Sequence, residues 1–250
     1  MYHELEVEGR PVSQTEPGYL RYVVRELDFQ QQMEWLRNAG LLGISVSEAL
    51  GGNASDRIAI TFDDGCETDL TVAAPILRKL NFGATFYITV GFLGRPGYLV
   101  AGQLRELSDG GFEIGCHSMT HPYLTDLDEL QLHREIVEAK SRLEEMTGRS
   151  VQHFSCPGGR WSPAISAIAR RAGYRSVTTS RIAVNRATGD PFQLARIPVM
   201  RGLTLNSFQD MCQGRGLWRR QLRSALQAKS HQLLGNALYD RLRGLVLRKS

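Results

Sequence analysis

Residues 58–65 read Ile-Ala-Ile-Thr-Phe-Asp-Asp-Gly, a short apolar run that ends in two adjacent carboxylates and a glycine. The run Ile58–Phe62 is rich in β-branched and aromatic side chains, which predicts a buried strand. In parallel α/β folds, functional sites are built at the carboxyl ends of strands, where Asp63 and Asp64 would lie. Adjacent carboxylates repel each other unless something such as a metal cation neutralises one of them. A surface turn is the alternative, because Asp-Gly pairs are common in turns.

Strand-like and helix-like segments alternate along most of the chain around this run. Further strands are expected over Gly43–Val46, Ala84–Val90, Phe112–Cys116, Val151–Cys156, Tyr174–Thr179 and Ala195–Met200. Helices are expected over Phe29–Ala39, Leu70–Leu80, Gln103–Asp109, Asp126–Met146 and Ser162–Ala172. This alternation favours a parallel sheet with helical crossovers. About seven such units in roughly 200 residues suggest a barrel more than an open sheet.

A second motif, His117-Ser118-Met119-Thr120-His121, follows the expected strand Phe112–Cys116. Two imidazoles four residues apart can face one metal if the loop between them forms a single helical turn. Two unrelated loop residues are the alternative. Because both motifs follow strands, a parallel fold would bring them to one rim. One carboxylate and two imidazoles with open coordination positions are typical of a catalytic metal site. The second carboxylate would then be free to accept a proton from water.

These two motifs, TFDDG at 61–65 and HSMTH at 117–121, resemble the first two motifs of the polysaccharide deacetylases. That family is also called carbohydrate esterase family 4 or the NodB homology family, and the resemblance spans roughly Tyr2 to Val199. It implies an α/β fold, namely a distorted (β/α)7-type barrel. It also implies a hydrolase that removes N-acetyl groups from amino sugars in polymers such as chitin, peptidoglycan and biofilm glucans.

The resemblance also assigns roles to the residues of the two motifs. Asp63 corresponds to the general base. Asp64, His117 and His121 correspond to the ligands of a divalent metal. Zinc is the expected ion because it suits Asp/His₂ ligation, although related ligand sets accept other divalent ions.

The third family motif usually reads Arg-x-Pro-x-Gly, and Ser155-Cys156-Pro157-Gly158-Gly159 aligns to it with serine in place of the arginine. In the family this arginine pairs with the base aspartate, so its replacement leaves the charge partner of Asp63 open. Arg160 is the nearby candidate. The resemblance places Pro157 and Gly158 in the substrate-binding turn. It also implies that the backbone N–H of Gly158 helps to bind an oxyanion.

The late family motif, a Leu-x-His that carries the general acid, does not appear after Ala195–Val199. Some members, including the poly-N-acetylglucosamine deacetylases of biofilms, are circularly permuted and carry this histidine near the N-terminus in a Tyr-His pair. Met1-Tyr2-His3-Glu4 resembles that start, and those members also lack the third-motif arginine. The resemblance therefore implies His3 as the general acid. A terminal histidine without a role is the alternative.

The chain has 250 residues, with apolar and charged contents of 42% and 22%, which are ordinary values for a globular protein. Its net charge of +4 is unevenly distributed, because residues 201–250 carry ten Lys or Arg and two Asp or Glu. We expect a deacetylase-like barrel over residues 1–202 and a basic, amphipathic helical extension over residues 203–250. Leucines at helical spacing in Leu217–Leu247 predict helices that pack on the barrel or attach to an anionic membrane surface or an acidic glycan.

The remaining expectations concern location and partners. Neither a signal-peptide pattern nor an apolar run of roughly 18 residues is present in the chain, which favours a cytoplasmic or membrane-associated protein. An acetylated amino-sugar polymer or oligomer is the expected substrate. Nucleic acid is not expected as a partner, because no recognition module accompanies the basic residues. An amide hydrolase for a small non-sugar substrate and a non-catalytic glycan-binding protein of the same fold are the alternatives.

Overall fold

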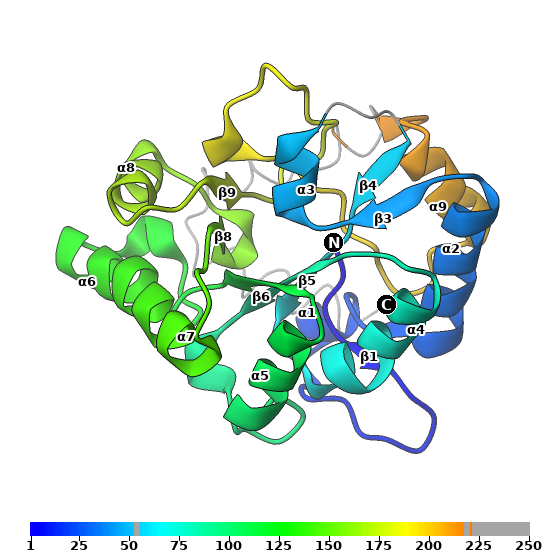
Figure 1. Ribbon diagram of the computed structural model, residues 1–250, viewed down its shortest axis with the longest axis horizontal. Coiled ribbons are helices and arrows are strands. Elements are labelled where there is room, and N and C mark those ends of the chain that lie inside the picture. The colour runs from blue at the N-terminus through cyan, green and yellow to red at the C-terminus, as the bar shows by residue number, and fades with distance from the viewer. Residues whose placement is uncertain (53–55, 218–220, 222–250) are drawn as a thin grey trace.

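The computed structural model describes residues 1–52, 56–217 and 221, and its centre is a curled parallel sheet of five strands (Figure 1). The strand order is β5-β6-β7-β8-β9, so each strand lies beside the next one along the chain. The strands are β5 (Thr61–Asp64), β6 (Thr85–Ile88), β7 (Glu113–Cys116), β8 (His153–Ser155) and β9 (Ser176–Thr178). The sequence-based expectation of a parallel α/β fold is confirmed.

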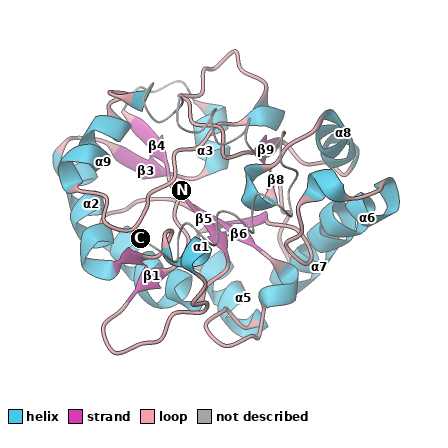
Figure 2. Ribbon diagram, turned by 180° about the vertical axis from the view of Figure 1, so that it is seen from behind, coloured by secondary structure: helices cyan, strands magenta, loops and turns pink. Residues whose placement is uncertain are grey.

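Most of the helices lie toward the outside of the molecule when it is seen from the front or from behind, whereas α1 (Pro17–Leu20) lies near the middle of both views (Figure 2). The other helices are α2 (Glu26–Asn38), α3 (Val46–Gly51), α4 (Ala74–Lys79), α5 (Ala101–Asp109), α6 (Glu129–His133), α7 (Ala139–Thr147), α8 (Pro163–Arg171) and α9 (Leu205–Cys212). Two π-helical turns, η1 (Asp69–Ala73) and η4 (Arg134–Glu138), precede α4 and α7. None of the helices in the described ranges is long and apolar enough to cross a bilayer.

The expected strand Ile58–Phe62 divides at Ile60. Its first part belongs to β4 (Arg57–Ala59), which pairs with β3 (Leu42–Ile44), whereas β5 pairs with β6. The amide of Ile60 donates to the carbonyl of Ile44, and the carbonyl of Ile60 accepts from the amide of Thr85. This one residue therefore passes the chain from the outer strand pair to the central sheet.

An irregular segment continues the sheet beyond β9. Leu194 forms a parallel bridge with Thr178, which places residues 194–199 beside that strand. We expected a strand over Ala195–Met200, but its hydrogen bonds are too scattered to form a ladder. At the far end of the segment the amide of Val199 donates to the carbonyl of Met1 at 2.9 Å. The segment therefore joins β9 to the N-terminal residues.

The N-terminal residues complete the ring of strands at β5. The amide of Tyr2 donates to the carbonyl of Thr61 at 2.8 Å, and the amide of Asp63 donates to the carbonyl of Tyr2 at 3.0 Å. A second short parallel pair, β1 (Leu5–Glu6) with β2 (Val24–Arg25), follows directly. Because the two closing segments are irregular, the barrel is distorted, as expected. The closure also carries His3 to the end of β5.

Aromatic packing holds β5 and β6 against the helices. Phe62 stacks on Phe86 with ring centroids 4.8 Å apart, and Phe29 of α2 meets Phe62 edge-on at 5.6 Å. All three side chains are fully buried. Because side chains alternate across a strand, the residue that follows Phe62 points to the opposite face, into the barrel, and this residue is Asp63.

Helix α9 packs on the same core, although its residues fall in the expected C-terminal extension. Phe208 meets Trp35 of α2 at 6.1 Å, and both Phe208 and Met211 belong to the hydrophobic cluster. The basic leucine-rich helices that we expected over Leu217–Leu247 lie almost entirely outside the described residues. Membrane attachment through this segment therefore stays a prediction.

A buried polar network lies at the amino ends of the strands. Oε2 of Glu113 accepts hydrogen bonds from the amides of Val46 and Ser47 and from the hydroxyl of Thr85, and Oε1 lies 3.4 Å from Nε2 of His153. Burial raises the pKa of Glu113, but His153 and the donors more than offset this effect and hold the pKa at about 2. This end of an α/β barrel serves stability more than chemistry.

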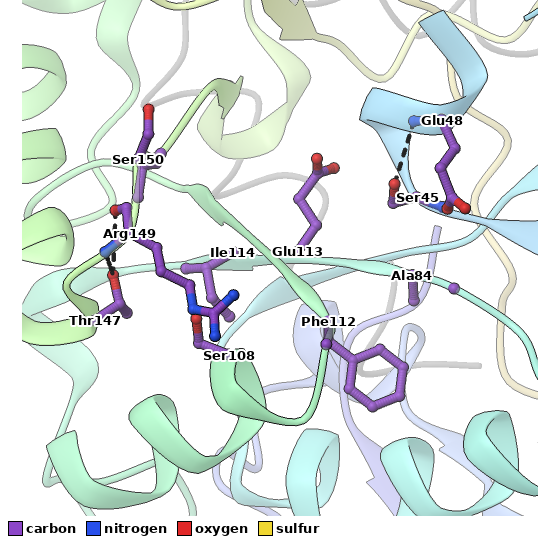
Figure 3. Close-up of a pocket in the computed structure, with 13 residues that line it drawn as sticks. Ser45, Glu48, Ala84, Ser108, Phe112, Glu113, Ile114, Thr147, Arg149 and Ser150 are labelled. Carbon is purple, nitrogen blue, oxygen red and sulfur yellow. Dashed lines mark hydrogen bonds between the residues drawn. The ribbon is translucent and has the colours of Figure 1, made fainter. Parts of the chain in front are cut away.

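A cavity of about 410 Å³ lies beside this network (Figure 3). Glu113, Glu48, Arg149 and Ser150 are among the residues that line it. Because the cavity is at the amino ends of the strands, it lies away from the residues that the two sequence motifs place at the carboxyl ends.

Candidate active site

Motif residues Asp63 and Asp64 end β5 at the carboxyl edge of the sheet. The backbone of Asp64 adopts a left-handed conformation with φ of 83°, and Gly65 follows with φ of 84°. A side chain on Gly65 would lie 3.1 Å from the side chain of Ile88, so glycine suits both the turn and the space. A left-handed residue other than glycine costs about 1–3 kcal/mol, and such strain concentrates at functional sites. The sharp turn directs the two carboxylates into different environments.

The structure brings Asp64, His117 and His121 together at this edge. Oδ1 of Asp64 lies 3.6 Å from Nε2 of His117 and 3.4 Å from Nε2 of His121. The three ligand atoms all lie within 4.8 Å of one another. Oδ1 of Asp64 is buried and has no hydrogen-bond partner, an arrangement that is costly unless a cation satisfies it. The donor set of one carboxylate and two imidazoles therefore fits a divalent metal.

His117 is oriented by the neighbouring strand. Its Nδ1 lies 2.9 Å from the carbonyl oxygen of Ser155 in β8. This oxygen can only accept a hydrogen bond, so the proton of the neutral ring is on Nδ1. The lone pair of Nε2 is then directed at Asp64. Burial lowers the pKa of His117 to about 4, although the adjacent Asp63 opposes this shift. The imidazole is therefore neutral at pH 7 and available as a ligand. His121 is more open, with 32% of its side chain exposed.

The charge partner of Asp63 is Arg196, which the sequence analysis missed. Nη1 of Arg196 donates to Oδ1 of Asp63 at 2.7 Å, and Nη2 donates to Oδ2 at 2.8 Å. Nη2 also donates to the hydroxyl of Ser155, which in turn donates to Asp63. Burial alone would raise the pKa of Asp63, but the guanidinium and its hydrogen bonds hold it well below its usual range. Asp63 is therefore an ionised, rigidly held carboxylate.

Arg160 was the sequence-based candidate for this partner, and the structure places it elsewhere. The guanidinium carbon of Arg160 lies 3.4 Å from the ring centroid of Tyr123, in a stacked arrangement. Arg196 enters the barrel from the segment that closes it. One signal for it was present in the sequence, because Arg196 is the single charged residue in the apolar run 195–200. An arginine in an inward-facing run needs a buried anion beside it.

The turn of the third motif follows β8 as expected. Gly158 has φ of 61°, and a side chain there would lie 2.8 Å from the ring of Tyr123. Both the backbone conformation and the close approach of Tyr123 therefore require glycine at this position. Pro157 is buried next to it.

His3 lies beside the two carboxylates because Tyr2 is paired with β5. Its ring packs on Tyr22 with centroids 4.7 Å apart, and its Nδ1 is buried without a hydrogen-bond partner. Burial lowers the pKa of His3, while the negative charges of Asp64 and Asp63 act in the opposite direction. His3, although it is near the N-terminus of the sequence, therefore lies at the rim of the site.

Fold and site together define a class, the parallel α/β barrels that gather polar side chains at the carboxyl ends of their strands. The family model for polysaccharide deacetylases matches residues 51–177, about half of the chain, and the chain belongs to this family. Its named members are deacetylases, hydrolases that act on carbon–nitrogen bonds other than peptide bonds.

Individual relatives agree with this assignment. YxkH of Bacillus subtilis is 28% identical over 192 residues, which cover 74% of this chain and 68% of YxkH. The peptidoglycan-N-acetylglucosamine deacetylase of Bacillus cereus is 36% identical over 125 residues, which are 49% of this chain and 56% of that enzyme. The match therefore spans little more than half of the second relative.

A solved structure supports the fold. The deacetylase PplD of Streptococcus pyogenes, determined in complex with acetate, superposes with a TM-score of 0.75 at 22% identity. The match covers 84% of this chain and 95% of PplD. The expected deacetylase fold is thus confirmed, whereas membership of the permuted subgroup and the domain boundary at residue 202 stay predictions.

Proposed function

We propose that this protein is a divalent-metal-dependent hydrolase that removes N-acetyl groups from the amino sugars of a polysaccharide. The observation that carries the proposal is the convergence of Asp64, His117 and His121 beside Asp63, which Arg196 keeps ionised. Family membership supports deacetylation of sugars. The polymer itself is proposed only as a class, an acetylated amino-sugar chain or oligomer.

Asp63 is proposed as the general base. When bound by the three ligands, a metal such as zinc supplies a Lewis acid that lowers the pKa of a water molecule. Arg196 and Ser155 together occupy both lone pairs of Oδ2 of Asp63, so Asp63 accepts the proton of that water through the remaining lone pair of Oδ1. Its low pKa makes Asp63 a weak base, and a bound metal would offset this by making the water more acidic. Arg196 also fixes the carboxylate in one orientation.

Gly158 and His3 are proposed to act on the two ends of the breaking bond. The N–H of Gly158 stabilises the negative charge that develops on the acetyl oxygen, and the strict turn geometry holds that donor in place. The imidazole of His3 gives a proton to the nitrogen of the leaving amine. The carbon–nitrogen bond breaks, and the products are acetate and a free amino sugar.

Acetate release from acetylated glucosamine oligomers tests the proposed function. We expect acetate to form with time, to stop when a chelator removes the metal, and to resume when zinc is added back. Hydrolysis of small amides without any action on oligomers would favour the alternative of a small-substrate amide hydrolase. Saturable oligomer binding without acetate release would instead indicate a glycan-binding protein.

The role of His3 predicts an effect that depends on the leaving group. We expect His3→Gln to lower kcat for an acetylated oligomer by about 10²–10⁴-fold, because the amine then leaves without a proton donor. The same variant should lose less than about threefold on an activated aryl acetate, whose leaving group needs no proton. Equal losses on both substrates would show that His3 is not the acid. Zinc affinity, measured by competition with a chromophoric chelator, serves as the control and should not change.

A further inference from the structure

Glu135 is a buried carboxylate outside the three motifs, and its contacts are directed at the second motif. The residue as a whole is 6% exposed. Oε2 accepts hydrogen bonds from the amide of Met119 at 2.9 Å and from the amide of Thr120 at 2.8 Å. Oε1 accepts a hydrogen bond from the hydroxyl of Thr120 at 2.7 Å. Three donors of the loop between His117 and His121 thus end on a single side chain.

The loop that Glu135 holds has a demanding backbone. Ser118 and His121 both adopt left-handed conformations, with φ of 71° and 66°. Residues other than glycine rarely do so, because each such residue brings its Cβ too close to the backbone. The loop therefore needs external contacts to keep its shape.

Further contacts to the loop come from the 3₁₀ turn Val90–Phe92, which follows β6. The amide of Gly91 donates to the carbonyl of Met119 at 2.7 Å, and the amide of Val90 donates to the carbonyl of Ser118 at 3.2 Å. These bonds satisfy loop carbonyls, whereas Glu135 satisfies loop amides. A carboxylate is the suitable acceptor there, since it accepts several charge-assisted hydrogen bonds at once.

The helix that carries Glu135 is modified at this point. The expected continuous helix Asp126–Met146 contains the π turn η4 (Arg134–Glu138), in which Glu135 and Ile136 are both buried. A π turn inserts one residue into the helical repeat, and such turns occur frequently at functional sites. Here the insertion accompanies a charged residue on the buried face of an amphipathic helix.

We propose that Glu135 is a positioning residue, which holds residues 118–120 so that His117 and His121 both face Asp64. This inference rests on the proposed metal site. The effect should fall mainly on His121, because His117 is fixed independently by the carbonyl of Ser155. Groups that orient metal ligands indirectly in this way commonly change metal affinity about 10–100-fold when they are removed.

Zinc affinity of the purified full chain tests the inference, and Glu113 provides a matched control. Like Glu135, Glu113 is a largely buried carboxylate that accepts from two backbone amides and one threonine hydroxyl, but it lies at the opposite end of the strands. We expect Glu135→Ala to weaken zinc binding about 10–100-fold and Glu113→Ala to change it less than about threefold. Both variants should lower the melting temperature of the metal-free protein.

A conservative variant and a milder one keep the test informative if Glu135→Ala does not fold. A glutamine side chain can accept the two amides through its oxygen and donate to the Thr120 hydroxyl, so Glu135→Gln should retain most of the zinc affinity. Thr120→Val removes one of the three bonds, and we expect a loss of about 3–10-fold. Zinc affinity within threefold of wild type in both Glu135→Ala and Thr120→Val, or an equal loss in Glu113→Ala, would overturn the inference.

Hydrogen exchange in the metal-free protein gives a second readout that needs no ion. The amides of Met119 and Thr120 should exchange at least about tenfold faster in Glu135→Ala than in Glu113→Ala, because only the former loses their acceptor. Unchanged protection would contradict the proposal. If wild-type protein itself fails to bind zinc or another divalent ion, the proposed function fails, and the exchange result still decides whether Glu135 holds the loop.

Discussion

Asp63→Asn should reduce acetate release by about 10²–10⁴-fold, because the variant removes the proton acceptor. Zinc should stay bound with near-wild-type affinity, because the variant keeps all three ligands. The asparagine oxygen can still accept one hydrogen bond from Arg196, but its NH₂ group faces a second donor. We therefore also expect a loss of stability. The measurements are kcat on an acetylated oligomer, zinc affinity and thermal unfolding of the same preparation.

Asp190→Asn is the matched control for Asp63→Asn. Asp190 also pairs with an arginine, Arg170, but on the surface, with 39% of its side chain exposed. We expect this variant to keep full activity and nearly full stability, because exposed ion pairs contribute only about 0–1 kcal/mol. Wild-type turnover in Asp63→Asn would refute the assignment of the base. Loss of zinc together with turnover would assign Asp63 to the ligands.

Arg196→Met should destabilise the protein strongly, because it leaves Asp63 as a buried charge without a partner. Breaking one side of a buried ion pair typically costs about 3–5 kcal/mol. Wild-type Asp63 has a folded-state pKa below its unfolded value, so the stability from this pair is present above the unfolded pKa. That contribution is lost as the pH falls through the folded pKa. The difference between wild type and variant should therefore be largest near neutral pH and should narrow in acid.

The same substitution should change the pH dependence of turnover. Without the guanidinium, burial raises the pKa of Asp63, so the carboxylate becomes protonated at higher pH. The acidic limb of the kcat/KM profile should then move to higher pH in Arg196→Met, with a lower maximum. An unchanged acidic limb would show that Arg196 does not control the protonation of Asp63.

Arg170→Met is the matched control for this second pair of measurements. It removes the exposed partner of Asp190, so denaturant unfolding should show a change below about 1 kcal/mol. Its pH–rate profile should coincide with that of wild type. Equal destabilisation by both arginine variants would argue that the buried pair with Asp63 has no special contribution.

The sequence was sufficient to predict the fold class, and the residues of the proposed site could be selected from it for a local reason. In a parallel sheet, every strand presents its carboxyl end to the same rim, so residues that follow apolar runs converge. Asp63 and Asp64 follow one run, and His117 follows another. The proposed metal ligands could therefore be selected from strand patterns and spacing, before any contact between distant residues was known.

Two side chains that support these motifs required knowledge of the tertiary structure. Arg196 and Asp63 are 133 residues apart, and they meet because the irregular segment 194–199 runs beside β9 and then joins the N-terminus. Glu135 reaches Met119 and Thr120 from a helix whose π turn no periodicity indicated. In both cases, which side chain contacts the motif depends on how a distant segment of the chain packs against the carboxyl ends of the strands.

The N-terminal motif was found partly from the sequence and partly from the tertiary structure. The Tyr-His pair at 2–3 was visible in the sequence, but its distance from the other motifs along the chain gave no geometric reason to join them. Hydrogen bonds of Tyr2 with Thr61 and Asp63 place it at β5. Short-range hydrophobic patterns therefore specified strands, helices and the rim residues. The long-range contacts that close the barrel specified which charged and hydrogen-bonding groups surround the rim residues. A buried polar or charged group needs a partner, and this requirement arises only once the chain has folded and buried it.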